Sequence, residues 1–128
     1  MNLKPKILIV DDNVSNIIVI EELLCDLDVE LVRARSGLEA IEKTRQHDFA
    51  LILMDVQMPG MDGIEATQAI RQMKIEQPYI IAMTANAMSK DRDECIRMGM
   101  NDYIAKPMRL AEIIKILKNA AVYHNHPD

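Results

Sequence analysis

The 128-residue chain lacks several patterns that mark whole classes of protein. No apolar stretch approaches the ~20 residues of a membrane-spanning helix. The formal net charge is −5 and no long basic run is present, which argues against direct binding of nucleic acid. The first residues do not resemble a signal peptide, and Cys25 and Cys95 are far apart and form no motif. We therefore expect a cytoplasmic protein with reduced thiols and no membrane contact.

What is present is a chain of ordinary domain length without a linker or a low-complexity segment. A chain of 128 residues can bury a sizeable hydrophobic core. We expect a single domain over residues 1–122. The remaining residues, 123–128, are expected to form a disordered tail.

Short apolar runs alternate with amphipathic helical patterns along the whole chain. The apolar runs predict five strands, at Lys6–Val10, Glu30–Ala34, 50–54, 79–83 and Asp102–Ala105. The helical patterns predict five helices, at about 13–27, 36–47, 62–72, 89–98 and from residue 110 onward. Strict alternation of strand and helix implies a parallel sheet with helices on both faces.

Local signals indicate where three of these helices begin or end. Ser36 with Glu39 three residues later, and Asp62 with Glu65, are patterns typical of capping boxes at helix N-termini. Gly99 follows the fourth helical pattern and is predicted to terminate that helix in the C′ position.

Four of the five expected strands lead into residues that carry chemistry. Asp11 and Asp12 follow the first strand, and Asp55 follows the third. Thr84 follows the fourth strand and Lys106 the fifth, whereas the second strand offers no such residue in this pattern. The carboxyl ends of parallel strands share one edge of the sheet, where ligands bind. We therefore expect these side chains to converge on one crevice.

This set of side chains suits phosphoryl transfer. Asp55 can act as a carboxylate nucleophile. Mg²⁺ held by Asp12 and Asp55 would neutralise the oxygens of an incoming phosphoryl group. Lys106 can neutralise another oxygen, and Thr84 can donate a hydrogen bond to a third. Without an ion the three carboxylates would repel one another, so the site is expected to need the metal.

The motifs around these residues resemble those of the receiver domain of two-component response regulators. The resemblance covers essentially the whole chain and rests on residues 10–13 (VDDN), 53–63 (LMDVQMPGMDG), 83–85 (MTA) and 105–107 (AKP). The sequences at 81–88 (IAMTANAM) and 102–107 (DYIAKP) are most similar to those of receiver domains in phosphorelays and hybrid histidine kinases. Such a domain has a flavodoxin-like α/β fold with a doubly wound parallel sheet of order 2-1-3-4-5.

The resemblance also implies roles for individual residues. Asp55 takes the phosphoacceptor position, and Lys106 holds a phosphoryl oxygen. Asp12 and Asp55 take the direct positions around Mg²⁺, or Mn²⁺ in its place, with the backbone carbonyl of Gln57 as a third ligand and Asp11 acting through water. Thr84 and Tyr103 match the family's switch pair, in which the aromatic ring turns inward when the threonine moves toward the phosphoryl group.

The resemblance implies two kinds of partner. A histidine kinase or a histidine phosphotransfer protein donates the phosphoryl group, and an output domain or partner protein responds to the phosphorylated domain.

Residues 17–20 are four consecutive apolar residues on the first expected helix, and they cannot all face one core. A stripe through Val19, Ile20 and Leu23 is expected to face the core. This leaves an exposed patch that we expect to bind the donor, made of Val14, Ile17 and Ile18.

Other functions compete with this interpretation. A phosphatase of the haloacid-dehalogenase type also uses an aspartate nucleophile and Mg²⁺, but it needs a second aspartate two residues on, where this chain has Gln57. A flavodoxin would need a Ser/Thr/Gly-rich phosphate loop after the first strand, where this chain has Asp11 and Asp12. A degenerate receiver that serves only as an interaction module is the remaining alternative. We expect a phosphoacceptor that is not a turnover enzyme.

Overall fold

The computed structural model describes residues 4–84, 89–106 and 108–124. Its centre is a five-stranded parallel sheet in the order β2-β1-β3-β4-β5. The strands are β1 (Lys6–Val10), β2 (Glu30–Ala34), β3 (Leu51–Asp55), β4 (Tyr79–Thr84) and β5 (Asp102–Ala105). The helices are α1 (Val14–Leu24), α2 (Gly37–Gln46), α3 (Gly63–Arg71), α4 (Ser89–Arg97) and α5 (Leu110–His124). The predicted fold class and strand order are confirmed.

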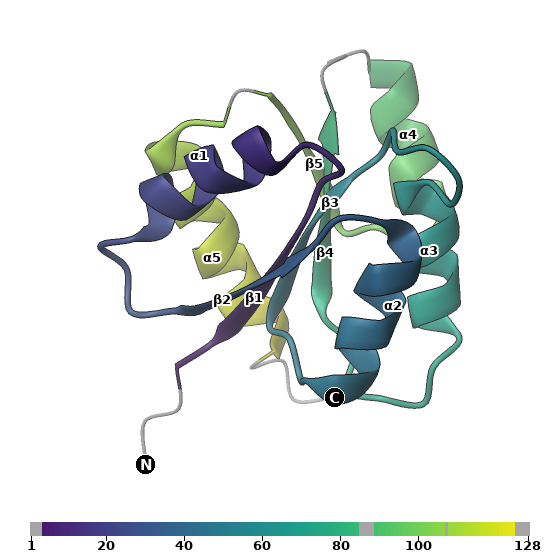
Figure 1. The fold of residues 1–128 in the computed structure, drawn as a ribbon, viewed down its shortest axis with the longest axis horizontal. Helices are drawn as coiled ribbons and strands as arrows, with labels where there is room; N and C mark the ends of the chain where they lie inside the picture. Colours follow the sequence, from purple (N-terminus) through teal and green to yellow (C-terminus); the bar gives the residue numbers. More distant parts are fainter. Residues whose placement is uncertain (1–3, 85–88, 107, 125–128) are drawn as a thin grey trace.

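Two layers of helices cover the sheet. Figure 1 shows α1 and α5 on one face, and α2, α3 and α4 on the other. Side chains alternate along each strand, so Ile7 and Ile9 of β1 pack against the first layer and Leu8 and Val10 against the second. All five residues of β3 are buried, because this strand is covered on both faces and paired on both sides.

The expected strands and caps are reproduced with small shifts. β3 and β4 each end one residue later than predicted, because Asp55 pairs with Met83 and Thr84 with Ala105 in the ladders. β3 also begins one residue later than predicted, at Leu51. Ser36 and Asp62 cap α2 and α3 as predicted. The Asp62 cap is a complete capping box, whereas the carboxylate that should complete the box at Ser36 accepts instead from the backbone N–H of the preceding residue.

Gly99 ends α4 as expected, with φ at 113°. Its N–H donates to the carbonyl of Ile96, and the N–H of Met100 donates to that of Cys95. This pair of bonds satisfies carbonyls at the end of the helix.

Two helix ends differ from prediction. α1 ends at Leu24, three residues early, and Cys25 serves as its C-cap. α5 continues through His124, so the predicted tail begins too early; residues 125–128 lie outside the described residues. Contacts that the sequence does not reveal hold this last turn: the Tyr123 and Tyr79 rings are 5.4 Å apart, and His124 Nε2 lies 2.7 Å from the Ala50 carbonyl oxygen.

The orientation of α1 also corrects a prediction. Ile17 is 0% exposed and faces the core with Ile20 and Leu24, so it does not belong to an exposed patch. Val19, expected in the core, is 52% exposed beside Ile18 at 40%. Two adjacent apolar stripes run along this helix, and the way it leaves β1 decides which one is buried.

In the described part of the chain no helix is long and apolar enough to cross a bilayer.

Candidate functional site

The carboxyl ends of four strands meet as the strand order requires. β1 and β3 are neighbours, with Val10 opposite Met54, so Asp11 and Asp55 emerge side by side. Lys106 follows β5, two strands away from β3, and its long side chain spans the distance. Its Nζ lies 2.9 Å from Asp11 Oδ2 and 3.4 Å from Asp55 Oδ1.

Three carboxylates form one cluster at this edge. Asp11, Asp12 and Asp55 each offer an oxygen within 4.8 Å of the others. Asp11 is fully buried and Asp55 is 5% exposed, whereas Asp12 is exposed to solvent. The cluster therefore has a buried floor and one solvent-facing carboxylate.

Backbone groups fix the two buried carboxylates. Asp11 Oδ1 accepts from the N–H of Asn13 at 2.9 Å, and Asn13 in turn caps α1. Asp55 Oδ1 accepts from the N–H of Gln57 at 3.3 Å. Gly63, the first residue of α3, lies so close to Asp55 that a Cβ there would collide with the Asp55 carbonyl oxygen. The loop after β3 and the start of α3 thus determine where Asp55 stands.

The charges at the site are unbalanced. Burial, together with the neighbouring Asp11 carboxylate, raises the pKa of Asp55 to about 6, although Lys106 and the Gln57 N–H act in the opposite sense. Burial alone would lower the pKa of Lys106, but its hydrogen bond to Asp11 and the charge of Asp55 outweigh burial and raise it. Lys106 therefore remains a cation, and its ammonium group contacts two of the three carboxylates, Asp11 and Asp55.

The donor set fits a divalent cation. All three side chains offer carboxylate oxygens, the ligands that hard cations such as Mg²⁺ prefer. Burial and the Asp11 carboxylate disfavour the ionised form of Asp55, and a bound cation would offset both effects. The acidic cluster could therefore hold a metal ion.

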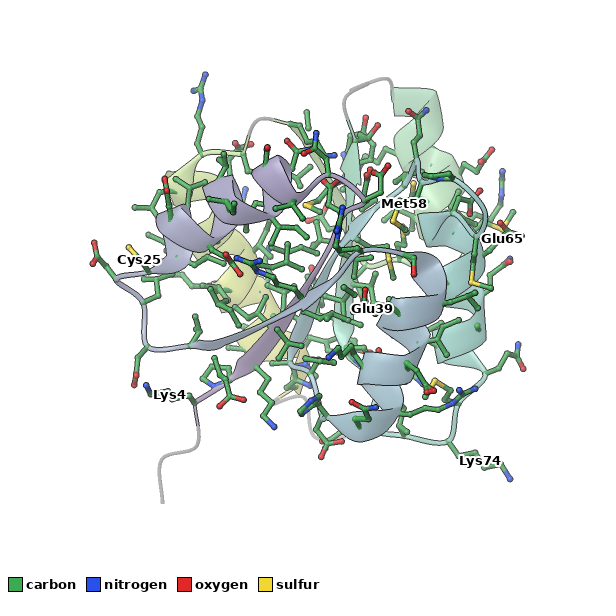
Figure 2. All side chains as sticks on the ribbon, viewed as in Figure 1. Lys4, Cys25, Glu39, Met58, Glu65 and Lys74 are labelled. Atoms are coloured by element: carbon green, nitrogen blue, oxygen red, sulfur yellow. The ribbon has the colours of Figure 1, made fainter. Side chains whose placement is uncertain are left out.

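Thr84 and Tyr103 line a hollow of about 500 Å³ beside this cluster. The hollow lies between the loop after β3, where Met58 is labelled in Figure 2, and α4, from which Cys95 contributes. Thr84 is buried at the end of β4, and its carbonyl accepts from the N–H of Lys106 at 2.8 Å. Tyr103 is half-buried and packs against the core on the α2–α3–α4 side. The two residues assigned to the switch thus share one hollow.

Arg35 at the end of β2 was not among the predicted site residues. Arg35 directly follows Ala34, the last residue of that strand, and its Nη2 lies 3.5 Å from the Asp12 carbonyl oxygen. Its position in the sequence could have indicated this, because Arg35 directly follows a strand just as Asp11 follows β1 and Lys106 follows β5. With Arg35 included, all five strands contribute to this edge.

Comparison with known proteins agrees with this geometry. Residues 7–118 match the family model of the response regulator receiver domain. The chain is 39% identical over 117 residues to the sensor protein GacS of Pseudomonas syringae pv. syringae, which covers 88% of this chain and 13% of that protein. It is 40% identical over 112 residues to the signal transduction histidine-protein kinase BarA of Escherichia coli K12, covering 87% of this chain and 12% of BarA. The chain thus spans a small part of these relatives.

Solved structures are similar over nearly the whole chain. One is the receiver domain of the sensor histidine kinase PA1611 from Pseudomonas aeruginosa, with a magnesium ion coordinated in its active site cleft. It is 39% identical with a TM-score of 0.83, covering 91% of this chain and 97% of that one. Another is the receiver domain of Ssk1 in complex with the histidine phosphotransfer protein Ypd1 from Saccharomyces cerevisiae. It is 29% identical with a TM-score of 0.85, covering 97% of this chain and 94% of that one.

These matches exclude the flavodoxin and phosphatase alternatives, because the family model covers most of the chain and the fold agrees with solved receivers. Domains of this family are phosphoacceptor switches and not turnover enzymes. The chain belongs to the response regulator receiver domain family of two-component signalling.

Proposed function

We propose that Asp55 accepts a phosphoryl group from a phosphohistidine and that the domain then signals to a partner protein or an output domain. The observation that carries this proposal is the Asp55 carboxylate itself. It is 5% exposed, lies 3.4 Å from the Lys106 ammonium, and belongs to an acidic cluster within 4.8 Å. A nucleophile held beside a cation in this way is suited to attack a phosphoryl group.

The transfer exchanges one bond for another. A carboxylate oxygen of Asp55 forms a bond to phosphorus while the bond from phosphorus to the donor imidazole breaks, and the imidazole leaves with its electron pair. Lys106 is placed to neutralise a phosphoryl oxygen, and Thr84 can donate its hydroxyl to another. A Mg²⁺ ion bound by Asp12, Asp55 and the Gln57 carbonyl, with Asp11 acting through water, would supply the remaining positive charge. Mn²⁺ could take its place, and the magnesium in the PA1611 receiver supports this assignment.

A histidine kinase or a histidine phosphotransfer protein is the proposed donor. The sensor kinases among the relatives and the Ypd1 complex of Ssk1 support this class of partner. α1 offers a matching surface through exposed Ile18 and Val19 beside half-buried Val14. An adjoining apolar groove of about 320 Å³ is lined by Val19 and also by Lys106 of the site, so a helix docked there would reach the crevice.

A labelling experiment tests the proposed function. Incubation with a small phosphodonor and Mg²⁺ is expected to add the mass of one phosphoryl group, which is lost slowly by hydrolysis. Asp55→Asn and removal of the metal with a chelator should each abolish the mass gain. Full labelling of Asp55→Asn would contradict the assignment of Asp55, and no labelling of the wild type would favour the degenerate receiver.

A further inference from the structure

The end of β2 brings a cation to the rim of the acidic cluster. β2 is the edge strand beside β1, with Ala34 opposite Val10, and the N–H of Asp11 donates to the Ala34 carbonyl at 3.1 Å. Arg35 therefore lies beside the Asp11–Asp12 segment, on the side away from β3. Asp55 and Lys106 approach the same segment from the other side.

The Arg35 side chain is exposed and its charge is not neutralised by an ion pair. Its Nη2 contacts the Asp12 carbonyl oxygen at 3.5 Å, and none of the described carboxylates forms a salt bridge with its guanidinium. Glu39, labelled in Figure 2 in the first turn of α2, accepts from the backbone N–H of Arg35 at 2.7 Å. The backbone of Arg35 is thus fixed at the rim while its charge faces solvent.

The charge of Arg35 has a direct consequence for binding. Among the contacts described, Lys106 is the only cation paired with a carboxylate of the acidic cluster, and Arg35 contacts the backbone of Asp12 beside it. An anionic phosphodonor must approach this cluster from solvent, where charges act over about 8 Å at physiological ionic strength. A cation at the mouth of the crevice attracts the donor and repels Mg²⁺.

We propose that Arg35 is a positioning residue that steers anionic phosphodonors into the crevice and, by the same charge, weakens Mg²⁺ binding there. This rests on the proposed function of Asp55. The contact of 3.5 Å is too long to be a strong hydrogen bond, so the charge and not the bond carries the effect. The bond from Arg35 N–H to Glu39 is made by the backbone and survives substitution of the side chain.

Arg45 provides a matched control. It is an exposed arginine near the other end of α2, and its contact is a 3.5 Å ion pair with Glu42 one turn away. Arg35→Gln and Arg45→Gln each change the formal net charge from −5 to −6. Any difference between them therefore reports where the charge stands and not how much charge the protein has.

Two measurements on these variants test the proposal. One is the second-order rate of labelling by acetyl phosphate at saturating Mg²⁺, and the other is the Kd of Mg²⁺ alone by calorimetry. Arg35→Gln should slow labelling by about threefold and tighten Mg²⁺ binding by about twofold at low salt, as expected for one screened charge at the rim. Both effects should disappear in high salt. Arg45→Gln should change neither, and Arg35→Lys should stay close to wild type in both.

The opposite signs of the two effects separate steering from a structural role. A loss of local structure would weaken labelling and Mg²⁺ binding together, and that result would overturn the proposal. Equal behaviour of Arg35→Gln and Arg45→Gln would overturn it as well, and so would failure of Arg35→Lys to retain labelling. If the wild type is not labelled, the proposed function itself fails and steering fails with it.

Discussion

The surroundings of Asp55 in the folded protein oppose ionisation of its carboxyl group. Burial and the Asp11 carboxylate raise its pKa from 3.8 to about 6 in the metal-free protein. Because the folded state holds this proton more tightly than the unfolded state does, the associated stability is fully present below about pH 4. It is lost as the pH rises through about 6. At neutral pH the ionised Asp55 therefore destabilises the metal-free fold.

Asp55→Asn should relieve this cost. In chelator at pH 7.5 we expect the free energy of unfolding to rise by about 1 kcal/mol, a value already reduced for solvent screening, and the gain should vanish near pH 4. Added Mg²⁺ should raise the Tm of the wild type much more than that of the variant. Thermal unfolding at both pH values, with and without Mg²⁺, checks this. A variant less stable than wild type in chelator at pH 7.5 would contradict it.

Single residues were predictable from sequence where a strand leads directly into them. Asp11, Asp55, Thr84 and Lys106 all lie at the carboxyl edge, because parallel strands share that edge whatever their order. Arg35 obeys the same rule but was not predicted, because β2 alternates only weakly and its C-terminal end is less distinct in the sequence than the ends of the other strands. How deeply Asp55 is buried could not be predicted, since that depends on the approach of α3 at Gly63.

At the scale of elements, helix starts were easier to predict than helix ends. Ser36 and Asp62 cap the N-termini of α2 and α3 through hydrogen bonds to residues three positions later, and such short-range patterns can be recognised in the sequence. The end of α5 depends on a contact far along the chain, that of His124 with Ala50. Which side of α1 is buried depends on how the helix packs on the sheet. For this reason the prediction placed Val19 in the core and Ile17 on the surface, whereas the structure shows the reverse.

The corrected orientation of α1 leads to a prediction about docking. Ile18→Glu and Val19→Glu should slow transfer from a phosphohistidine donor while leaving labelling by a small phosphodonor unchanged, because both side chains are exposed on α1 and Val19 lines the groove that Lys106 also lines. Ile17→Glu should instead destabilise the fold by ~3 kcal/mol or more, since it buries a charge. Paired rate measurements and thermal unfolding distinguish these effects.

Val122→Glu is the control for this surface. Val122 is 69% exposed in the last turns of α5, so a charge there tests whether any exposed apolar residue would give the same result. It should leave both rates unchanged. If Ile18→Glu slows the small phosphodonor as much as the phosphohistidine donor, the α1 surface supports the fold and does not dock the partner.

At the scale of the whole molecule, the sheet connects the site to the surface near α4. β4 and β5 are paired, and they place Thr84 and Tyr103 on the same hollow beneath α4. A phosphoryl group on Asp55 would offer the Thr84 hydroxyl a new acceptor, and we expect movement of Thr84 to change the space open to the Tyr103 ring. Such a change would convert chemistry at one edge into a change of surface near α4.

Beryllofluoride, a mimic of the phosphoryl group, should therefore shift Tyr103 toward a buried position. The chain has three tyrosines, so incorporation of fluorotyrosine gives three ¹⁹F resonances that Tyr→Phe variants can assign. Tyr103 should respond to the mimic, whereas Tyr79, whose ring packs 5.4 Å from that of Tyr123 toward the opposite edge of the sheet, should not. Thr84→Ala should abolish the Tyr103 response while the protein still binds the mimic at Asp55. An unchanged Tyr103 resonance in the saturated wild type would show that this pair does not transmit the signal.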